Sequence, residues 1–296
     1  MGQKDLVSKQ LENYPDVFAD IVNVFVYDGK RVILEDELEP APTETFYKSN
    51  SGELRNQFHD VSKYQMINGT RQVQYTLENE ISSKRKTVFR KAGYAGAVYR
   101  EQYDGKEEFP FVSLLLYWGK GRWKKPRSLE EMFVRKTLPQ ELMKYVDEIK
   151  LHVYDMRSLS ADVRQLFRSD MRLVVDYLAE GTAYVPTKQK IVHVEAFLNM
   201  MYWITGDERY IKMIEEALLV EKEGEEVTMC EILDGFIERG IQQGIKQGIS
   251  QGISQGETLL ASLMNYLFVD NRLEEAKQVT TDEKRRKELY QEYGLI

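Results

Sequence analysis

The spacing of apolar residues predicts helix at the start of the chain. Over residues 6–27 apolar side chains recur every three or four positions, as they do on one face of an α-helix. Pro15 lies inside this stretch and disfavours a helix interior, so we expect two helices with a break at the proline. Asp28-Gly29 then predicts a turn, and residues 30–34 predict a short strand.

A β-hairpin is predicted further along. Residues 35–42, a polar stretch with two prolines, indicate irregular structure. Residues 54–67 alternate loosely between apolar and polar side chains, residues 71–81 alternate cleanly, and Asn68-Gly69 between them is typical of a tight reversal. One face of the hairpin is polar and acidic, and we expect it to face water. Its side chains on the second strand are Gln72, Gln74, Thr76, Glu78 and Glu80.

The pattern then indicates an α/β region that gives way to helices. Residues 86–103 predict a helix, residues 109–118 a strand buried on both faces, and residues 149–156 a second apolar strand. From Ser160 onward the spacing is helical. The fold class is therefore α/β followed by an all-helical region. We expect an α/β domain over residues 1–158, a helical domain over 159–239, a repeat over 240–256 and a helical tail over 257–296.

Residues 240–256 are an internal repeat in which a glycine recurs every fourth position beside an isoleucine. On an α-helix a four-residue step drifts by about 40° per repeat, so the isoleucines would form a slowly winding stripe. Each glycine inside a helix costs about 1 kcal/mol relative to alanine. The segment is therefore either a helix that needs a partner, which predicts self-association, or a flexible spacer.

Composition excludes several classes of protein. The net charge of −7 gives no overall attraction to nucleic acid or anionic membranes, so any phosphate-binding surface must be local. One cysteine and three histidines provide neither a disulfide framework nor the paired spacing of a zinc site. We expect a cytoplasmic protein, because the chain opens without an apolar signal segment and its longest apolar stretch is too short to cross a membrane.

Two carboxylates in the predicted hairpin are candidates for a metal site. Asp60 lies on the first strand and Glu78 near the end of the second, so the two strands can place them side by side. Paired carboxylates repel each other unless a hard cation such as Mg²⁺ lies between them, and that cation can position a water for phosphodiester hydrolysis. On spacing alone, the alternative is a solvated sheet face.

Several segments carry a family resemblance, in the same order along nearly the whole chain. They are FADIVNVFVYDG, HDVSKYQ, LENE, FRKAGYAGAVYREQ, FPFVSLLLYWG with RWKKPRSL behind it, and the glycine repeat. Together they resemble the recombination-promoting nuclease/putative transposase family, whose members are similar to PD-(D/E)XK endonucleases. The resemblance implies a restriction-endonuclease-like core with a mixed sheet, a divalent cation (Mg²⁺, Mn²⁺ or Ca²⁺) and DNA as the substrate.

The resemblance also implies roles for residues. In the PD-(D/E)XK pattern an acid ends one strand, and a second strand carries an acid, any residue and then lysine. This pattern implies Asp60 and Glu78 as metal ligands. The early acid on the first helix falls on Asp20, with Asp16 as the competing choice. Glu80 stands at the third position, where relatives in this family commonly have glutamine, and it completes the catalytic candidates.

Glu80 departs from both patterns and leaves three interpretations. A reversed charge about 4 Å from the attacked phosphate changes the interaction by roughly 4 kcal/mol at an effective dielectric near 20, which would silence catalysis. Alternatively, Glu80 is a third metal ligand, and a neighbouring lysine serves as the base. The candidates for that base are Lys63, Lys84 and Lys91. In the third interpretation Glu80 is a surface residue turned to solvent.

Basic residues after the acidic strand are candidates for contacts with DNA phosphates. They are Lys84, Arg85, Lys86 and Arg90, with a solvated helix start as the alternative. The segment 122–125, RWKK, combines a stacking ring with phosphate-binding cations, although a Trp after a buried strand more often packs in the core. His59 beside Asp60 is a possible general base, but it lacks a second histidine or a nucleophile nearby, which favours a spectator role.

The sequence thus predicts a divalent-metal-dependent DNA endonuclease associated with recombination or mobile elements. Asp60 and Glu78 would hold the metal, and Asp20 would take the outer acid position. One alternative is a catalytically inactive DNA-binding or oligomerising relative in which Glu80 marks a decayed site. A second alternative is a helical interaction module that acts through the glycine repeat. We expect a homo-oligomer and no membrane association.

Overall fold

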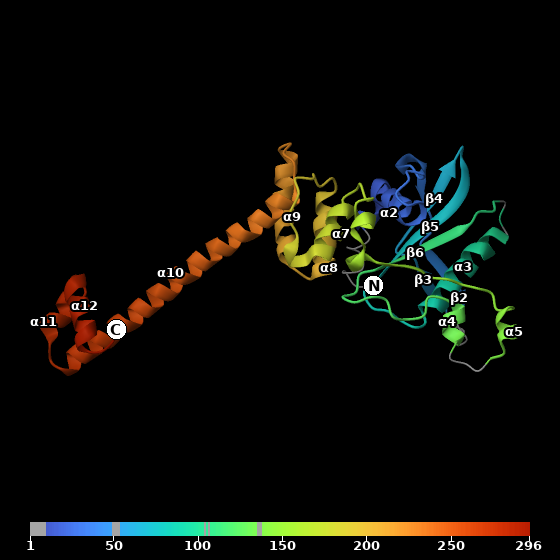
Figure 1. The fold of residues 1–296 in the computed structure, drawn as a ribbon. Helices are drawn as coiled ribbons and strands as arrows, with labels where there is room; N and C mark the ends of the chain where they lie inside the picture. The colour runs from blue at the N-terminus through green and yellow to red at the C-terminus, as the bar shows by residue number, and fades with distance from the viewer. Residues whose placement is uncertain (1–9, 49–53, 104, 106, 135–137) are drawn as a thin grey trace. The chain divides into compact units, whose positions relative to one another are not determined.

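A five-stranded mixed sheet organises the first part of the chain (Figure 1). Its strand order is β1-β4-β5-β6-β7, with β1, β4 and β5 antiparallel and with β6 parallel to both β5 and β7. The strands are β1 (Leu38–Pro40), β4 (Val61–Ile67), β5 (Thr70–Glu80), β6 (Phe111–Tyr117) and β7 (His152–Asp155). A separate antiparallel pair consists of β2 (Glu44–Lys48) and β3 (Leu54–Phe58). The α/β fold class is confirmed.

The computed structural model describes residues 10–48, 54–103, 105, 107–134 and 138–296. It divides into two compact units, residues 1–232 and residues 233–296. The helix start expected at Leu6 lies outside the described residues, and the finer division into four segments stays a prediction.

The β4–β5 hairpin has the predicted turn. Asn68 and Gly69 have φ angles of 52° and 74°, the left-handed conformation that a two-residue hairpin turn requires at both positions. The expected strand over residues 54–67 is wrong in one respect. It divides at His59 and Asp60, and the residues before this point pair with β2 while those after it pair with β5.

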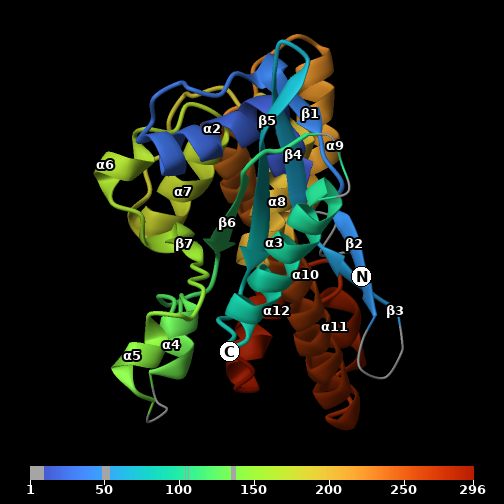
Figure 2. The same cartoon turned by 90° about the vertical axis from the view of Figure 1, so that its right-hand side faces the viewer.

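Two helices cover the two faces of the sheet (Figure 2). Helix α2 (Pro15–Tyr27) begins at Pro15, which confirms the predicted break, and the hydroxyl groups of Tyr27 and Tyr75 lie 2.7 Å apart. Helix α3 (Thr87–Tyr103) packs on the opposite face, where its Tyr94 joins Tyr64 and Phe111 in a buried cluster.

The expectation of a water-facing acidic face on the hairpin is wrong. Gln74, Thr76, Glu78 and Glu80 are at most 6% exposed. Helix α3 covers this face. Polar partners contact three of the four buried groups: for example, the side-chain amide of Gln74 donates to Ser62 Oγ at 3.0 Å, whereas Thr76 Oγ1 has no hydrogen-bond partner among the described residues. The alternation of residues 71–81 therefore indicates a polar cluster inside the protein rather than a solvated surface.

Two other expectations for the N-terminal region are wrong. Residues 30–34 are not a strand; the Asn23 side chain accepts hydrogen bonds from the N–H groups of Val32 and Ile33 and donates to the Ile33 carbonyl, so one amide replaces a strand partner. The proline-containing stretch includes the short strand β1, where Pro40 is tolerated because β1 is an edge strand.

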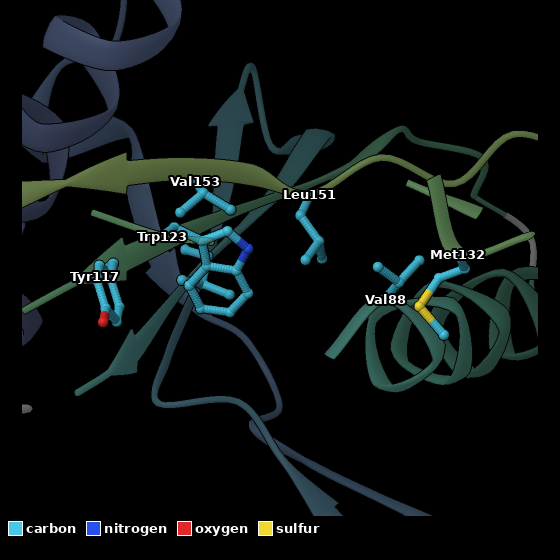
Figure 3. Packing of buried hydrophobic residues seen from close by; sticks show 7 residues of the cluster. Val88, Tyr117, Trp123, Met132, Leu151 and Val153 are labelled. Atoms are coloured by element: carbon cyan, nitrogen blue, oxygen red, sulfur yellow. The ribbon is translucent and has the colours of Figure 1, made fainter. Parts of the chain in front are cut away.

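A second apolar cluster lies where β6 and β7 meet the start of α3 (Figure 3). Val88 of α3 packs with Tyr117 of β6 and Val153 of β7, and Trp123 lies edge-on to Tyr117 with ring centroids 5.3 Å apart. The other members are Leu115, Met132 and Leu151. Strands β6 and β7 confirm the two apolar strands predicted from the sequence.

The remaining elements of the first unit are mainly helical. They are α4 (Leu129–Phe133), α5 (Gln140–Met143), α6 (Ala161–Arg164), α7 (Met171–Glu180), α8 (Val194–Thr205) and α9 (Arg209–Lys222), with 3-10 turns at Glu35–Glu37, Met156–Ser158 and Gly181–Ala183. They contact α2 through the Phe25–Phe167 ring pair and the Asp16–His193 pair. In the described part of the chain, no helix is both long and apolar enough to cross a membrane.

The glycine repeat is helical and lies within α10 (Met229–Val269). Its isoleucines are 57–59% exposed at positions 241, 245, 249 and 253. Helices α11 (Leu273–Gln278) and α12 (Glu283–Glu292) pack with the end of α10 around a small apolar cluster. This cluster contains Leu263, Leu267, Ala276, Val279 and Leu289.

Candidate functional site

The register of the hairpin brings the two predicted acids together. Val61 pairs with Leu77, so Asp60 is level with Glu78, and Glu80 lies two residues further along the same face of β5. Asp60 Oδ2 accepts a hydrogen bond from the backbone N–H of Asn79 at 2.6 Å. This bond fixes the Asp60 carboxylate against the strand that carries Glu78 and Glu80.

Arg90 of α3 bridges the two glutamates. Its Nη2 atom lies 2.5 Å from Glu80 Oε1 and 3.1 Å from Glu78 Oε2. Burial lowers the pKa of Arg90, but the two carboxylates outweigh this effect and the net shift is upward. Lys84 Nζ adds a longer contact of 3.9 Å to Glu80 Oε2. The interpretation of Glu80 as a surface residue turned to solvent is therefore wrong, because Glu80 is buried and ion-paired.

Lys91 and Tyr94 complete the α3 side of the cluster. Lys91 Nζ lies 4.7 Å from the centre of the Phe111 ring, and burial lowers the pKa of Lys91 to about 8 against the opposing attraction of Glu78. Burial, and then the charge of Glu78, raise the pKa of Tyr94. An amine that loses its proton near pH 8 can act both as a cation and as a base.

His59 packs inside this cluster. Its ring is 2% exposed and lies 4.3 Å from the Tyr94 ring, between centroids, and 5.6 Å from the Phe111 ring. Nδ1 is 3.6 Å from Glu78 Oε1, and within the described residues neither ring nitrogen has a hydrogen-bond partner. The predicted spectator role of His59 stays a prediction.

The structure separates the three lysine candidates. Lys63 lies on the α2 side of the sheet, with Nζ 3.4 Å from Asn13 Oδ1 and 5.7 Å from the centre of the Phe18 ring. The Lys84 side chain is 64% exposed. Lys91 is the candidate that is partly buried and lies within the field of Glu78.

Asp20 and Asp16 point to other partners. Asp20 Oδ2 accepts hydrogen bonds from the backbone N–H groups of Arg168 and Ser169, at 2.9 and 2.8 Å. Both carboxylate oxygens of Asp16 lie 3.0 Å from His193 Nε2. These contacts connect α2 to the helical segments and do not bring either acid to Asp60 or Glu78.

An early acid that the sequence analysis missed does contact β5. The Asn79 side-chain amide donates to Glu12 Oε2 at 2.6 Å and accepts from the indole N–H of Trp118 at 2.6 Å. Glu12 is completely buried, on the face of β5 opposite Glu78. Its position beside Leu11 in a helical pattern gave no signal for this role, because only the packing of the N-terminal segment on the sheet brings it to Asn79.

The predicted DNA-binding residues are largely engaged by the protein itself. Arg90 pairs with the acids, Lys84 lies near Glu80, and Arg85 Nη2 donates to the Met132 carbonyl of α4 at 2.6 Å. Lys86 is exposed. We call Asp60, Glu78 and Glu80, with the Arg90 guanidinium that pairs with the two glutamates, the acidic cluster. Because Arg90 belongs to this cluster, its guanidinium does not form part of a separate basic surface.

The donor set suits a hard cation held by few protein ligands. Asp60 and Glu78 provide carboxylate oxygens, and Mg²⁺ is commonly bound by one or two carboxylates while water and substrate phosphates complete its shell. In the described part of the chain, no group of three or more His, Cys, Asp or Glu side chains is arranged to hold a metal ion. Asp60 and Glu78 are therefore the residues that could hold such a cation, and the Arg90 guanidinium lies against the Glu78 carboxylate.

The comparisons with known proteins agree with the resemblance seen in the sequence. Residues 45–185, just under half of the chain, match the family model described as Putative transposase, YhgA-like. This segment contains the hairpin, α3 and β6, and the match is consistent with the PD-(D/E)XK superfamily. The comparison with curated proteins gave no match, and neither did the comparison with solved structures. The matched family suggests a function related to mobile elements, and residues 45–185 are similar to the YhgA-like putative transposases.

Proposed function

We propose that the first unit is a metal-dependent DNA endonuclease whose mixed sheet is a restriction-endonuclease-like core. The observation that carries this proposal is the hairpin register that places Asp60 level with Glu78, on a strand that also pairs in parallel with β6. The family match supports DNA as the partner. The protein would act in the cytoplasm, where its single cysteine, Cys230, needs no disulfide partner.

In this proposal each residue of the cluster has a defined task. Asp60 and Glu78 would hold the divalent cation, which when bound supplies positive charge for the attacked phosphate and lowers the pKa of water. The ammonium group of Lys91 would provide the cation that the superfamily pattern places at the position of Glu80. Arg90 would hold Glu80 away from the substrate through their ion pair, which reduces the repulsion between Glu80 and a phosphate.

A catalytically inactive DNA-binding relative is the second candidate. The ion pairs of Arg90 with both Glu78 and Glu80 favour it, because a guanidinium already neutralises the carboxylates that a metal would need. An inactive relative would bind DNA without cleaving it and would show no Mg²⁺ binding that depends on Asp60.

The test is nicking of supercoiled plasmid by the purified protein with Mg²⁺, Mn²⁺ or Ca²⁺. Asp60→Asn and Glu78→Gln keep the side-chain volumes, and each should lower the nicking rate by about 100-fold or more, since even groups that only orient metal ligands contribute about 10- to 100-fold. The matched controls are Asp36→Asn and Glu39→Gln, at positions outside the cluster. They should cleave like the wild type.

Calorimetric titration with Mg²⁺ separates the two candidates. Binding that is lost in Asp60→Asn, together with nicking by the wild type, supports the endonuclease. Wild-type rates in either cluster variant would exclude this site, and DNA binding without nicking or Mg²⁺ binding would establish the inactive relative.

A further inference from the structure

The loop that follows β6 carries a high local density of positive charge. Residues 119–127, GKGRWKKPR, contain five cations and no acid, in a chain whose net charge is −7. We call this segment the basic loop. Four of its cations have no ion-pair partner among the described residues, and Arg127 pairs with Asp155 at 3.5 Å. The four are Lys120, Arg122, Lys124 and Lys125.

The basic loop begins beside the acidic cluster. Glu80 pairs with Tyr117, and the Trp118 N–H donates to the Glu80 carbonyl at 2.8 Å. A side chain at Gly119 would bring its Cβ to 2.8 Å from the Ile81 carbonyl oxygen and into a clash with the Tyr117 hydroxyl. Only glycine therefore lets the chain leave the sheet this close to Glu80, and the first cation follows at once.

Trp123 fixes the middle of the basic loop. Its ring is buried in the apolar cluster of Figure 3, its backbone N–H donates to Asp155 Oδ1 at 2.9 Å, and its indole N–H donates to the Lys125 carbonyl at 2.8 Å. The buried ring cannot stack on a nucleobase. The tryptophan instead holds the neighbouring Arg122 and Lys124 on the exposed side, so the backbone that carries them is already ordered before a ligand binds.

A hollow of about 350 Å³ adjoins this anchored part of the loop. Arg122 and Arg127 line it together with Ser158 and Ser160. Guanidinium and hydroxyl groups are the usual partners of phosphate oxygens. Asp155 also lines the hollow, but its carboxylate is engaged by the Trp123 N–H and by Arg127.

We propose that the basic loop binds the phosphate backbone of duplex DNA and so presents an adjacent phosphodiester to the acidic cluster. The choice of DNA rests on the proposed function, whereas the phosphate chemistry rests on the unpaired cations and their anchoring. Within the segment 84–90, Arg85 and Arg90 are engaged by the Met132 carbonyl and by Glu80, so the basic loop offers more free cations to phosphate than that segment does.

The test compares two triple variants that change the net charge equally. The loop variant is Lys120→Gln, Arg122→Gln and Lys124→Gln. The control is Lys188→Gln, Lys222→Gln and Lys246→Gln, at exposed positions outside the basic loop. Fluorescence anisotropy with a labelled duplex is measured without divalent metal in the Asp60→Asn background, so that binding is read independently of cleavage. Circular dichroism checks that both variants fold.

The loop variant should bind at least about tenfold more weakly at 100 mM salt than the parent. Its slope of log Kd against log salt should fall by about 2 to 3, because each phosphate contact contributes about 0.9. An equal loss in the control variant, an unchanged slope, or a parent protein that does not bind DNA at low salt would overturn the proposal. If the protein binds DNA through the basic loop but does not nick plasmid, the proposal for the loop is supported. Only the proposed endonuclease activity is then contradicted.

Discussion

At the level of single residues, the acidic cluster is a balance of buried charges. Glu78 and Glu80 lie under α3, where one guanidinium bridges both of them and Lys91 adds a second cation at the edge of the cluster. Burying charges costs free energy that well-placed partners only partly return. The cluster is therefore expected to contribute little to stability, although removing one partner of a pair would leave an uncompensated buried charge.

Lys91 offers a direct measurement of this cost. Its pKa is about 8 in the folded protein and 10.5 as the ordinary value, so between these pH values the unfolded chain binds more protons and the free energy of unfolding rises with pH. Lys91→Met should raise the free energy of unfolding by about 3 kcal/mol at pH 7. The difference from the wild type should shrink between pH 8 and 10.5, as measured by urea denaturation.

Lys86→Met, at an exposed position just before α3, is the matched control and should change stability by less than about 0.5 kcal/mol at every pH. If the effect of Lys91→Met does not vary with pH, Lys91 is not held as a destabilised cation. Loss of nicking in Lys91→Met together with higher stability would show that the lysine is retained for its chemistry.

At the level of elements, the features that depend on neighbouring residues in the chain could be predicted from the sequence. The hairpin turn at Asn68-Gly69, the break at Pro15 and the two apolar strands all follow from backbone preferences and periodicity, and they are confirmed. The pairing of Asp60 with Glu78 follows from the hairpin turn. The burial of that face was not predictable, because alternation shows which side chains share a face but not what covers the face.

The same limit explains the errors. Residues 30–34 have the composition of a strand, but their partner is the Asn23 side chain from the preceding helix, α2. Glu12 has no motif around it and acquires its contact with Asn79 only through packing. The identity of the covering helix, and with it the roles of Arg90 and Lys91, required the three-dimensional arrangement.

Asn23 provides the test at this level. Asn23→Ala removes three hydrogen bonds and takes these partners from the buried N–H and carbonyl groups of Ile33, whereas the Val32 N–H keeps its bond to the Lys30 carbonyl at 2.9 Å. It should therefore lower the free energy of unfolding by about 3 kcal/mol. Asn199→Ala on α8 removes only a 3.4 Å contact and is the control, with an expected change below about 0.5 kcal/mol. Equal effects of the two substitutions in urea denaturation would contradict the role of Asn23 as a strand partner.

At the level of the whole molecule, helix α10 stands out because its glycine repeat makes few stabilising contacts within the chain. Its repeat contains glycines at about 1 kcal/mol each, and its isoleucines remain more than half exposed. A helix of this composition gains stability if a second copy of the repeat packs against the glycines, which allow close approach of two backbones. Self-association therefore stays our prediction for this segment.

Replacing Gly244, Gly248 and Gly252 with Leu tests this prediction. The substitutions should stabilise the isolated helix by roughly 2 to 3 kcal/mol in total, because leucine has a higher helix propensity than glycine. The larger side chains should also block the close approach of a second helix. Light scattering across a concentration series should then show a smaller molar mass for the triple variant than for the wild type. The same molar mass in both proteins would leave the repeat as a spacer.

The acidic cluster also has a short path to assembly during folding. His59, Asp60, Glu80 and Arg90 come from one continuous segment, residues 59–94, that consists of the β4–β5 hairpin and the first part of α3. Loop-closure entropy grows with the length of the closed loop, and contacts that are local in sequence form faster than distant ones. By contrast, the pairs Tyr27–Tyr75 and Phe25–Phe167 join segments far apart in the chain. We therefore expect the acidic cluster to form before α2 docks on the sheet. The charges of the cluster would then be paired early in folding, before the long-range contacts of the core are made.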